Sequence, residues 1–367
     1  MINDYKRWGA GTLMWSGILF AGAVLLSAIG ADPGIQALAK ETSKPVKYGK
    51  IDIRANDLDY FEYGSPSKKL FGRLKYLGGL SLLSSHSEFG GISGMSLGPD
   101  GRQLIAVTDD GNWITGELVY KATKPVGVRL AKISPLKALN GRSLKRKRQK
   151  DAEGIVFLNG SPRKGTVLIS FERTHRIGRF PVSTKGVGNP RSYLPFPKAL
   201  RGLKRNKGLE AITVLKGGRY KGRVLAFAER KISKDGHLKG WILLGKKAKP
   251  LLLKRIGGFD VTDLASLPNG DVLVLERRFR WSEGIQMRLR LIPVGALKPG
   301  GVITGETLLE ADGGYTIDNM EGMAVHQSKS GNTIITLISD DNFSILQRTL
   351  LLQFELLKSA KKVTARR

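Results

Sequence analysis

Acidic residues are scarce in this chain, and many of them stand at two recurring positions. The chain has 31 Asp and Glu among its 367 residues, against 61 Lys and Arg. One position opens a predicted strand hairpin, and the other closes it. The opening position holds Glu153, Glu210, Asp263 and Glu321, with Ser93 in the first copy. The closing position holds Asp109, Asp110, Glu172, Glu229, Glu276, Asp340 and Asp341.

Carboxylates that converge in this way are suited to binding a metal ion. They repel one another, and they stay ionised together only where cations or Arg side chains neutralise them. Oxygen ligands without Cys or paired His favour Ca²⁺ or Mg²⁺ over zinc. We therefore predict a metal site with Ca²⁺ as its cofactor. Its predicted ligands are Asp109, Glu153, Glu210, Asp263, Glu276, Glu321, Asp340 and Asp341.

Two further sets of residues complete the predicted site. The predicted catalytic residues are Glu153, Glu172, His175 and Glu321. His175 is included because it follows a closing carboxylate and imidazole titrates near neutral pH; an ordinary surface histidine is the alternative. The predicted substrate-binding residues are Arg173, Arg230 and Arg277, because guanidinium groups bind anionic oxygens. These arginines directly follow Glu172, Glu229 and Glu276, so a purely structural Glu–Arg network is also open. The absence of Cys excludes thiol catalysis and Cys-ligated zinc.

The two acidic positions belong to a segment that repeats along the chain. Each copy opens with a small residue, and these residues recur at intervals of 54 to 60. They are Gly94, Gly154, Ala211, Ala265 and Gly322. A long period with several short strands per unit is typical of β-propeller blades. Glycine is also frequent, at 46 of 367 residues, which suits a fold with many tight turns.

We therefore predict an all-β protein, a β-propeller with five visible blade repeats. Residues 51–84 contain two more plausible strands, so a sixth blade stays open. The last copy offers only three strands before the chain ends. We predict that a strand from the N-terminal side completes it and closes the ring, because closure removes exposed sheet edges.

The N-terminal region has the composition of an export segment. Lys6 and Arg7 precede an apolar core at residues 18–29, and residues 37–39 offer a small-x-small cleavage site. We predict that residues 1–39 are a signal peptide or an N-terminal membrane anchor, 40–50 a linker, 51–357 the propeller and 358–367 a basic tail. The protein is then expected to be exported, either periplasmic or anchored to the inner membrane and facing the periplasm.

The net charge of +30 predicts an attraction to anions. Residues 142–150 (RSLKRKRQK) and 198–207 (KALRGLKRNK) are strongly basic, and each run directly precedes an opening carboxylate. In a propeller these loops would fringe one mouth of the central channel and draw in an anionic substrate; mobile, solvated loops are the alternative. No helix-turn-helix, zinc-finger or RNA-recognition signature is present, so we expect no nucleic-acid partner.

At these residues the chain resembles the family known as esterase-like activity of phytase, or the phytase-like domain. The similarity runs from about residue 70 to residue 357. The segments that carry it are GGISGMSLGPDGRQLIAVTDDG (90–111), DAEGIVFL (151–158), ISFER (169–173), NKGLEAITVL (206–215), DLASLPNGDVLVLERRF (263–279), DNMEGMAV (318–325) and SDDNFSILQRTLLLQFEL (339–356). Ala211 and Ala265 depart from the Gly expected after the opening carboxylate, and Leu264 stands where other copies carry Glu.

The resemblance implies an exported, propeller-like protein that hydrolyses phosphate esters or other esters. The first hypothesis is a metal-dependent hydrolase of phosphate esters or other anionic ester substrates. The second is a non-catalytic propeller that binds an envelope polyanion or a protein partner, since a fold does not assign a function. The third is a carboxylic-ester or lactone hydrolase on the same metal platform.

Overall fold

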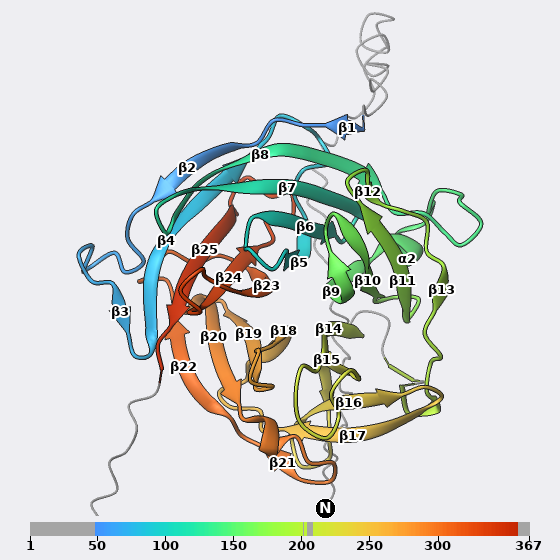
Figure 1. Cartoon of the computed structure of the whole chain (residues 1–367). Helices are drawn as coiled ribbons and strands as arrows, with labels where there is room; N and C mark the ends of the chain where they lie inside the picture. Colours follow the sequence, from blue (N-terminus) through green and yellow to red (C-terminus); the bar gives the residue numbers. More distant parts are fainter. Residues whose placement is uncertain (1–47, 201, 204–207, 359–367) are drawn as a thin grey trace, which may run out of the picture. The chain divides into compact units, whose positions relative to one another are not determined.

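The computed structural model describes residues 48–200, 202–203 and 208–358. These residues form five sheets arranged around a common centre, as the blades of a propeller (Figure 1), and all strand pairs are antiparallel except β17 with β21. The predicted export segment, residues 40–47 of the predicted linker and residues 359–367 of the predicted tail lie outside the described residues. Within the described ranges, no helix is both long and apolar enough to cross a membrane.

Each sheet begins with a strand at the centre of the ring and proceeds outward. Blade one consists of β5 (Ile92–Leu97), β6 (Gln103–Thr108), β7 (Asn112–Lys121), β8 (Lys124–Pro135) and β1 (Gly49–Lys50). Blade two consists of β9 (Ala152–Ser161), β10 (Lys164–Phe171), β11 (Arg176–Ser183) and β12 (Gly186–Val187), with β13 (Ser192–Tyr193) also paired to β11. Blade three consists of β14 (Leu209–Val214), β15 (Val224–Ile232), β16 (Leu238–Leu244), β17 (Lys247–Leu253) and β21 (Val302–Ile303).

The remaining two blades and the short helices complete the described chain. Blade four consists of β18 (Asp260–Ser266), β19 (Val272–Arg280), β20 (Gly284–Ile292) and β22 (Glu306–Ala311). Blade five consists of β23 (Met320–Gln327), β24 (Thr333–Ser339), β25 (Thr349–Leu356), β4 (Leu74–Leu83) and β2 (Arg54–Leu58), with β3 (Leu70–Phe71) also paired to β4. The helical turns are α2 (Lys147–Lys150), η1 (Lys198–Leu200) and η2 (Val294–Ala296).

The ring is closed by a strand from the N-terminal side, as the sequence predicted. β4 pairs with β25 over residues 74–82, so the fifth blade is built from both ends of the described chain. Residues 51–84 therefore supply the outer strands of blade five and do not form a sixth blade. The protein is a five-bladed propeller. Closure in this way joins the two ends of the described chain within one sheet.

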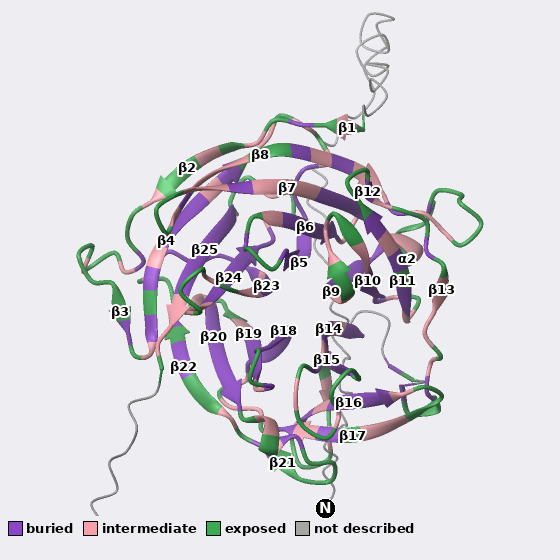
Figure 2. Ribbon diagram, in the orientation of Figure 1, coloured by how far each residue is buried: buried purple, intermediate pink, exposed green. Residues whose placement is uncertain are grey.

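The apolar residues of the strands fill the spaces between neighbouring blades. Five buried clusters are present in the described chain, one at each interface between two blades. Figure 2 shows the inner strands largely buried, with exposed residues along outer strands such as β2 and β22. Because a blade can bury its two faces only against its neighbours, the five sheets are stabilised as one ring.

The small residue of each repeat lies where two inner strands approach closely. A Cβ atom added to Gly94 of β5 would lie 2.4 Å from the carbonyl oxygen of Glu153 in β9. One added to Gly154 would lie 2.8 Å from the carbonyl oxygen of Glu210 in β14. At these positions the repeated glycine reflects the narrow ring of inner strands, and not the need for a special backbone conformation.

We expect Gly154→Ala to destabilise the ring. The new methyl group would contact a backbone oxygen that is fixed in a neighbouring strand, and overpacking of this kind costs about 1–3 kcal/mol. The measurement is the free energy of unfolding by chemical denaturation. Gly127→Ala in β8 is the matched control, because an added Cβ there has no atom within 4 Å. Equal stability of the two variants would show that the inner strands can separate freely.

Candidate metal site at one mouth of the central channel

Every inner strand carries a β-bulge near its first residue, and the bulged residue lies at one mouth of the channel. In each bulge, one residue of the inner strand has no partner in the second strand of the blade. From blade one to blade five, the bulges contain Ser93, Glu153, Glu210, Thr262 and Glu321. A bulge leaves its extra residue out of the ladder and changes the direction of its side chain. Three of the predicted carboxylates therefore occupy equivalent positions.

A second set of equivalent positions lies in or directly after the last part of each second strand. In four blades the backbone N–H of this residue donates to the carbonyl oxygen two residues before the bulged residue, at 2.9–3.2 Å. These four residues are Asp109, Glu172, Glu229 and Asp340. In blade four the register pairs Arg277 with Asp260, which gives Arg277 the same place. The second set thus contains four carboxylates and one arginine.

Blade four differs from the alignment derived from the sequence. That alignment gave its opening position to Asp263 and its closing position to Glu276, whereas the strand register gives them to Thr262 and Arg277. Asp263 instead accepts hydrogen bonds from the N–H groups of Leu264 (2.7 Å) and Met323 (2.6 Å), which ties blade four to blade five. Glu276 is fully buried and ion-paired with Arg290. These two predicted ligands therefore do not join the carboxylates at the mouth.

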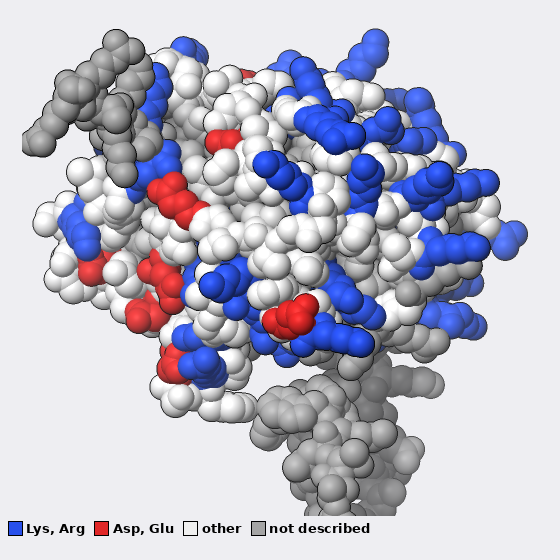
Figure 3. All heavy atoms as spheres, turned by 90° about the horizontal axis from the view of Figure 1, so that it is seen from below, with Lys and Arg blue, Asp and Glu red and all other residues white. Residues whose placement is uncertain are grey.

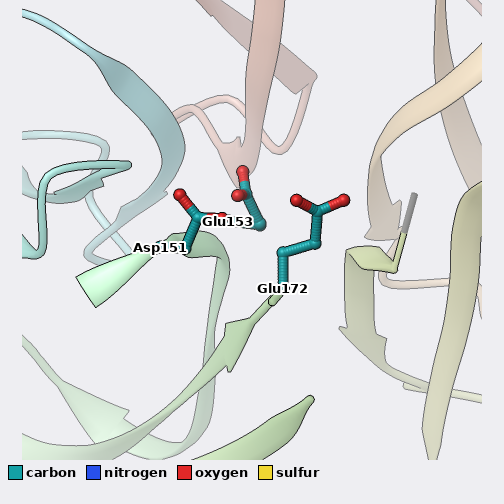
Figure 4. Close-up of side chains that lie close together, drawn as sticks. All are labelled: Asp151, Glu153 and Glu172. Carbon is teal, nitrogen blue, oxygen red and sulfur yellow. The ribbon is translucent and has the colours of Figure 1, made fainter. Parts of the chain in front are cut away.

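Two overlapping groups of carboxylates are close enough to share a cation. One oxygen from each of Asp151, Glu153 and Glu172 lies within 4.8 Å of the others. The same holds for Glu172, Glu210 and Glu229, so Glu172 belongs to both groups. Figure 4 shows the first group, with Asp151 and Glu153 at the start of β9 and Glu172 just after β10. Such oxygen spacings suit an ion that takes ligands at about 2.3–2.6 Å, as Ca²⁺ does.

The raised pKa values of these carboxylates also favour a cation site. Burial raises the pKa of Glu153 well above its usual value, and repulsion by Asp151, Glu321 and Glu172 raises it further. Burial together with neighbouring carboxylates does the same for the pKa of Glu210. Burial also raises the pKa of Glu172 to about 7. Within the described chain neither Glu153 nor Glu210 forms an ion pair with Lys or Arg, so no side-chain cation of these residues offsets the raised pKa values.

The other carboxylates of the mouth lie beside two cations that belong to the protein. Lys147 of α2 lies 3.2 Å from Asp151 and 3.5 Å from Asp110, and it also donates to Asp109. Arg277 lies 3.5 Å from Glu321 and 3.9 Å from Glu229. Burial raises the pKa of Asp340 to about 8, and Glu321 contributes to the increase. Lys147 and Arg277 thus flank the mouth on two sides, with the two carboxylate groups between them.

The remaining predicted residues hold the mouth in shape. Asp341 accepts hydrogen bonds from the N–H groups of Gly91 (3.0 Å) and Phe343 (3.1 Å), which connects blade five to blade one. Arg173 donates to Asp151 at 2.8 Å, so it orients one member of the first group. Arg230 pairs with Asp260 of the next blade. Of the three predicted substrate-binding arginines, Arg277 is the one that contacts the carboxylates of both equivalent sets.

His175 lies behind the carboxylate group and contacts the backbone. Its Nε2 atom is 3.3 Å from the carbonyl oxygen of Leu203, and its ring stacks on Phe196. It also packs against Gly208, whose N–H donates to Glu172 at 2.9 Å. The structure therefore places His175 against Gly208, the residue whose N–H orients Glu172.

Two residues of this site, Asp151 and Lys147, are not among the residues predicted from the sequence. Asp151 precedes the bulge of β9 and belongs to the first carboxylate group. Lys147 is one of six Lys or Arg residues in the basic run at 142–150. A signal was present for both residues, because this run directly precedes Asp151 and Glu153. The sequence did not show which of its cations turns inward.

A family model confirms the resemblance noted in the sequence. The model described as "Phytase-like: Esterase-like activity of phytase" matches residues 87–343, which span blade one to the loop after β24. The chain belongs to the phytase-like family. A comparison with curated proteins finds no match.

Three solved structures similar to this phytase-like propeller share little sequence with it. A chain of the S. cerevisiae complex of Dbp5 with Nup159, Gle1, IP6 and ADP has 10% identity and a TM-score of 0.34, covering 84% of this chain and 99% of that one. The β-propeller domain of Cps50 (Swd1) from Myceliophteria thermophila has 9% identity and a TM-score of 0.36, covering 82% and 99%. The Dos1 propeller has 9% identity and a TM-score of 0.32, covering 77% and 74%. These scores are too low to carry an argument.

A cavity of about 410 Å³ occupies the opposite mouth of the phytase-like propeller, at the far ends of the inner strands. It is lined mainly by apolar residues such as Phe157, Val214 and Met323. The carboxylate groups do not line this cavity. Among the described residues, buried carboxylates converge at the other mouth and not at this cavity, and such a convergence is typical of functional sites.

Proposed function

We propose that this protein is a cation-dependent hydrolase that acts on phosphate esters or other anionic esters. The observation that carries the proposal is the close approach of carboxylates in two groups that share Glu172. Glu153 belongs to the first group and Glu210 to the second, and within each group the oxygens lie no more than 4.8 Å apart. Membership of the phytase-like family supports hydrolysis. Because all the ligand atoms in these groups are carboxylate oxygens, the donor set fits a hard cation, and we propose Ca²⁺.

The residues of the mouth have distinct proposed roles. Glu172 would hold the cation from both groups, with Gly208 N–H fixing its orientation. Arg277 and Lys147 would bind the anionic oxygens of the substrate at the rim, as charge-assisted donors. Glu153 and Glu321 are the proposed proton acceptors, since burial raises the pKa of both carboxyls. A bound Ca²⁺ would polarise the ester and lower the pKa of a bound water molecule.

We expect chelator-sensitive hydrolysis from the purified protein. The measurement is turnover of chromogenic phosphate monoesters, phosphate diesters and carboxylic esters, first with excess Ca²⁺ and then with a chelator, with thermal melting followed in parallel. Phosphate release that stops on chelation supports the proposal. Cleavage of carboxylic esters alone would favour the esterase or lactonase alternative. No turnover, together with a melting temperature that falls on chelation, would leave the cation with a structural role only.

A non-catalytic role is the second candidate, and the surface charge supports it. Lys and Arg predominate over Asp and Glu on the side of the molecule seen in Figure 3, most clearly over its right-hand part. A propeller with this surface would bind an envelope polyanion such as an acidic polysaccharide. Tight, salt-sensitive binding without turnover would support this candidate, because ionic contacts weaken as salt screens them.

The location proposed for both candidates is the cell envelope. It follows from the sequence of residues 1–39, and export is tested by fractionating cells that express the full chain. Recovery of the protein in the cytosol would contradict this location without affecting the proposed chemistry.

A further inference from the structure

Large apolar side chains are exposed at the tips of two neighbouring loops on the carboxylate side of the ring. In blade four, Phe279 is 54% exposed and Trp281 is 82% exposed. In blade five, Phe343 is 46% exposed, Ile345 is 101% exposed and Leu346 is 87% exposed. We call these five residues the apolar rim. Isolated exposed apolar residues are ordinary, but several gathered at loop tips usually mark an interaction surface.

The strand directions place both loops beside the carboxylate mouth. β19 runs toward the mouth, since Arg277 near its end belongs to the second set of equivalent positions. Beyond Arg277, the last residues of β19 carry Phe279, and the turn that joins β19 to β20 carries Trp281. β24 likewise runs toward Asp340, and the loop after it carries Phe343, Ile345 and Leu346. The apolar rim therefore projects from the same face as the proposed metal site.

The fold holds the blade-five tip in a defined conformation. Asp341 accepts a hydrogen bond from Thr349 at 2.8 Å and another from Phe343 N–H, so the two ends of the loop are fastened together. Asn342 and Phe343 adopt positive φ angles of 48° and 51°, an uncommon conformation for residues other than glycine. The ring of Phe343 packs over Gly90 and Gly91. Ile345 and Leu346 are thus presented to solvent by an ordered loop.

The blade-four tip is ordered as well. Glu283 lies 2.7 Å from Arg278 and 2.7 Å from Arg280, which ties the two arms of the hairpin together. Phe279 and Trp281 meet edge to face, with ring centroids 5.4 Å apart. An aromatic pair at a hairpin tip, flanked by arginines, has the composition of the aromatic belts that lie at membrane interfaces.

Unpaired basic residues lie on the same face, at the junction of blades one and two. Arg142, Lys145, Arg146 and Arg148 are exposed on the segment that leads to Asp151, and they form no ion pair within the described chain. We call these four residues the basic loop. Apolar insertion and attraction of basic residues to anionic lipids are the two contributions that bind peripheral proteins to bilayers.

We propose that this face docks on an anionic lipid bilayer, with the apolar rim inserted among the lipids and the basic loop against their phosphate groups. The combination of exposed apolar tips with an exposed basic loop on one face favours an anionic bilayer over a protein partner. The inference does not depend on the proposed hydrolysis. If both hold, the metal site faces the phosphate esters of lipid headgroups.

Site-specific fluorescence tests the proposal, because the chain contains no Cys. Full-length Leu346→Cys and Trp281→Cys proteins are labelled with an environment-sensitive dye and mixed with vesicles of phosphatidylglycerol and phosphatidylcholine. Both labels are expected to shift to the blue and to be quenched by lipids brominated in their acyl chains. A label at Leu70→Cys is the matched control, because Leu70 is 56% exposed but lies at the opposite end of blade five. This control separates docking by the face from binding through residues 1–39.

Two further results are expected from the same assay. In the protein labelled at residue 281, Ile345→Glu should lower the affinity for the vesicles, measured by the fluorescence response, at least tenfold. The reason is that the tips insert together and burying an apolar side chain contributes about 1.5–3 kcal/mol. Neutralising the basic loop to Gln should remove the preference for anionic over purely zwitterionic vesicles. The proposal is overturned if the labels at residues 346 and 281 respond no more than the label at residue 70. It is also overturned if Ile345→Glu leaves the response at residue 281 unchanged, and the apolar rim would then be assigned to a protein partner.

Discussion

Glu172→Gln is expected to lower chelator-sensitive hydrolysis at least 100-fold and at the same time to stabilise the cation-free protein. Glu172 contributes an oxygen to both carboxylate groups, so its charge acts on every cation bound there. Even residues that only orient a metal ligand change affinity by about 10–100-fold when they are mutated. The measurements are kcat/KM against Ca²⁺ concentration, and the free energy of unfolding in chelator.

The expected gain in stability has a simple electrostatic cause. Glu172 lies among carboxylates that burial and mutual repulsion hold at raised pKa values. An amide of the same shape removes one repelling charge, and its oxygen can still accept the hydrogen bond from Gly208 N–H. A group that is destabilising in the fold but required for turnover is typical of a functional site.

Glu276→Gln is the matched control, and it should have the opposite signature. Glu276 is ion-paired with Arg290, and both side chains are fully buried. Removing one partner of a buried pair costs about 3–5 kcal/mol, because the other charge is left without compensation. We expect Glu276→Gln to lose stability while the folded fraction keeps its affinity for Ca²⁺. If Glu172→Gln were destabilising to a similar extent, the mouth would be a structural ion network.

The stability of the cation-free protein is expected to fall as the pH rises from about 6.5 to about 8.5. The pKa of Glu172 is raised to about 7 and that of Asp340 to about 8, both chiefly by burial. In this window the native state holds protons on these groups that the unfolded state has already lost. Stability therefore decreases with increasing pH until both groups have ionised. The decrease is expected to be on the order of 2 kcal/mol, since one pKa unit corresponds to about 1.4 kcal/mol.

In this pH window His326 does not contribute to the pH dependence of stability. Burial lowers the pKa of His326 to about 4, so its own effect on stability increases with pH but is complete above its unfolded value of 6.5. Above that pH the carboxylates dominate the slope. The measurement is denaturant unfolding in chelator at several pH values across the window.

Calcium should reverse this trend. Binding displaces the protons held by the carboxylates, so the cation competes with fewer protons as the pH rises. The gain in stability on adding Ca²⁺ is therefore expected to grow from about pH 6.5 to about pH 8.5. A gain that is independent of pH would mean that the cation binds elsewhere, and a rise in the stability of the chelated protein with pH would contradict the raised pKa values.

Much of the architecture could be predicted from the sequence alone. The repeat, its small residues and its missing last strand predicted a β-propeller closed from the N-terminal side, because each blade must bury its two faces against similar neighbours. The positions of Glu153, Glu210 and Glu321 were also predicted correctly as one equivalent set, since each directly precedes the small residue. The small residue itself was explained only by the close approach of the inner strands.

Only the tertiary structure decided which charged residues meet at the mouth. Successive side chains on a strand point to opposite faces, so a change of one residue in the register exchanges Glu276 for Arg277. That register is set by a bulge at Thr262, which the sequence did not mark. Lys147 and Asp151 meet across one turn of helix between blades. Their contacts with Asp109 of blade one and with Glu172 after β10 depend on the tertiary structure. The sequence determined the ring and its repeated acids, and the strand register determined the site.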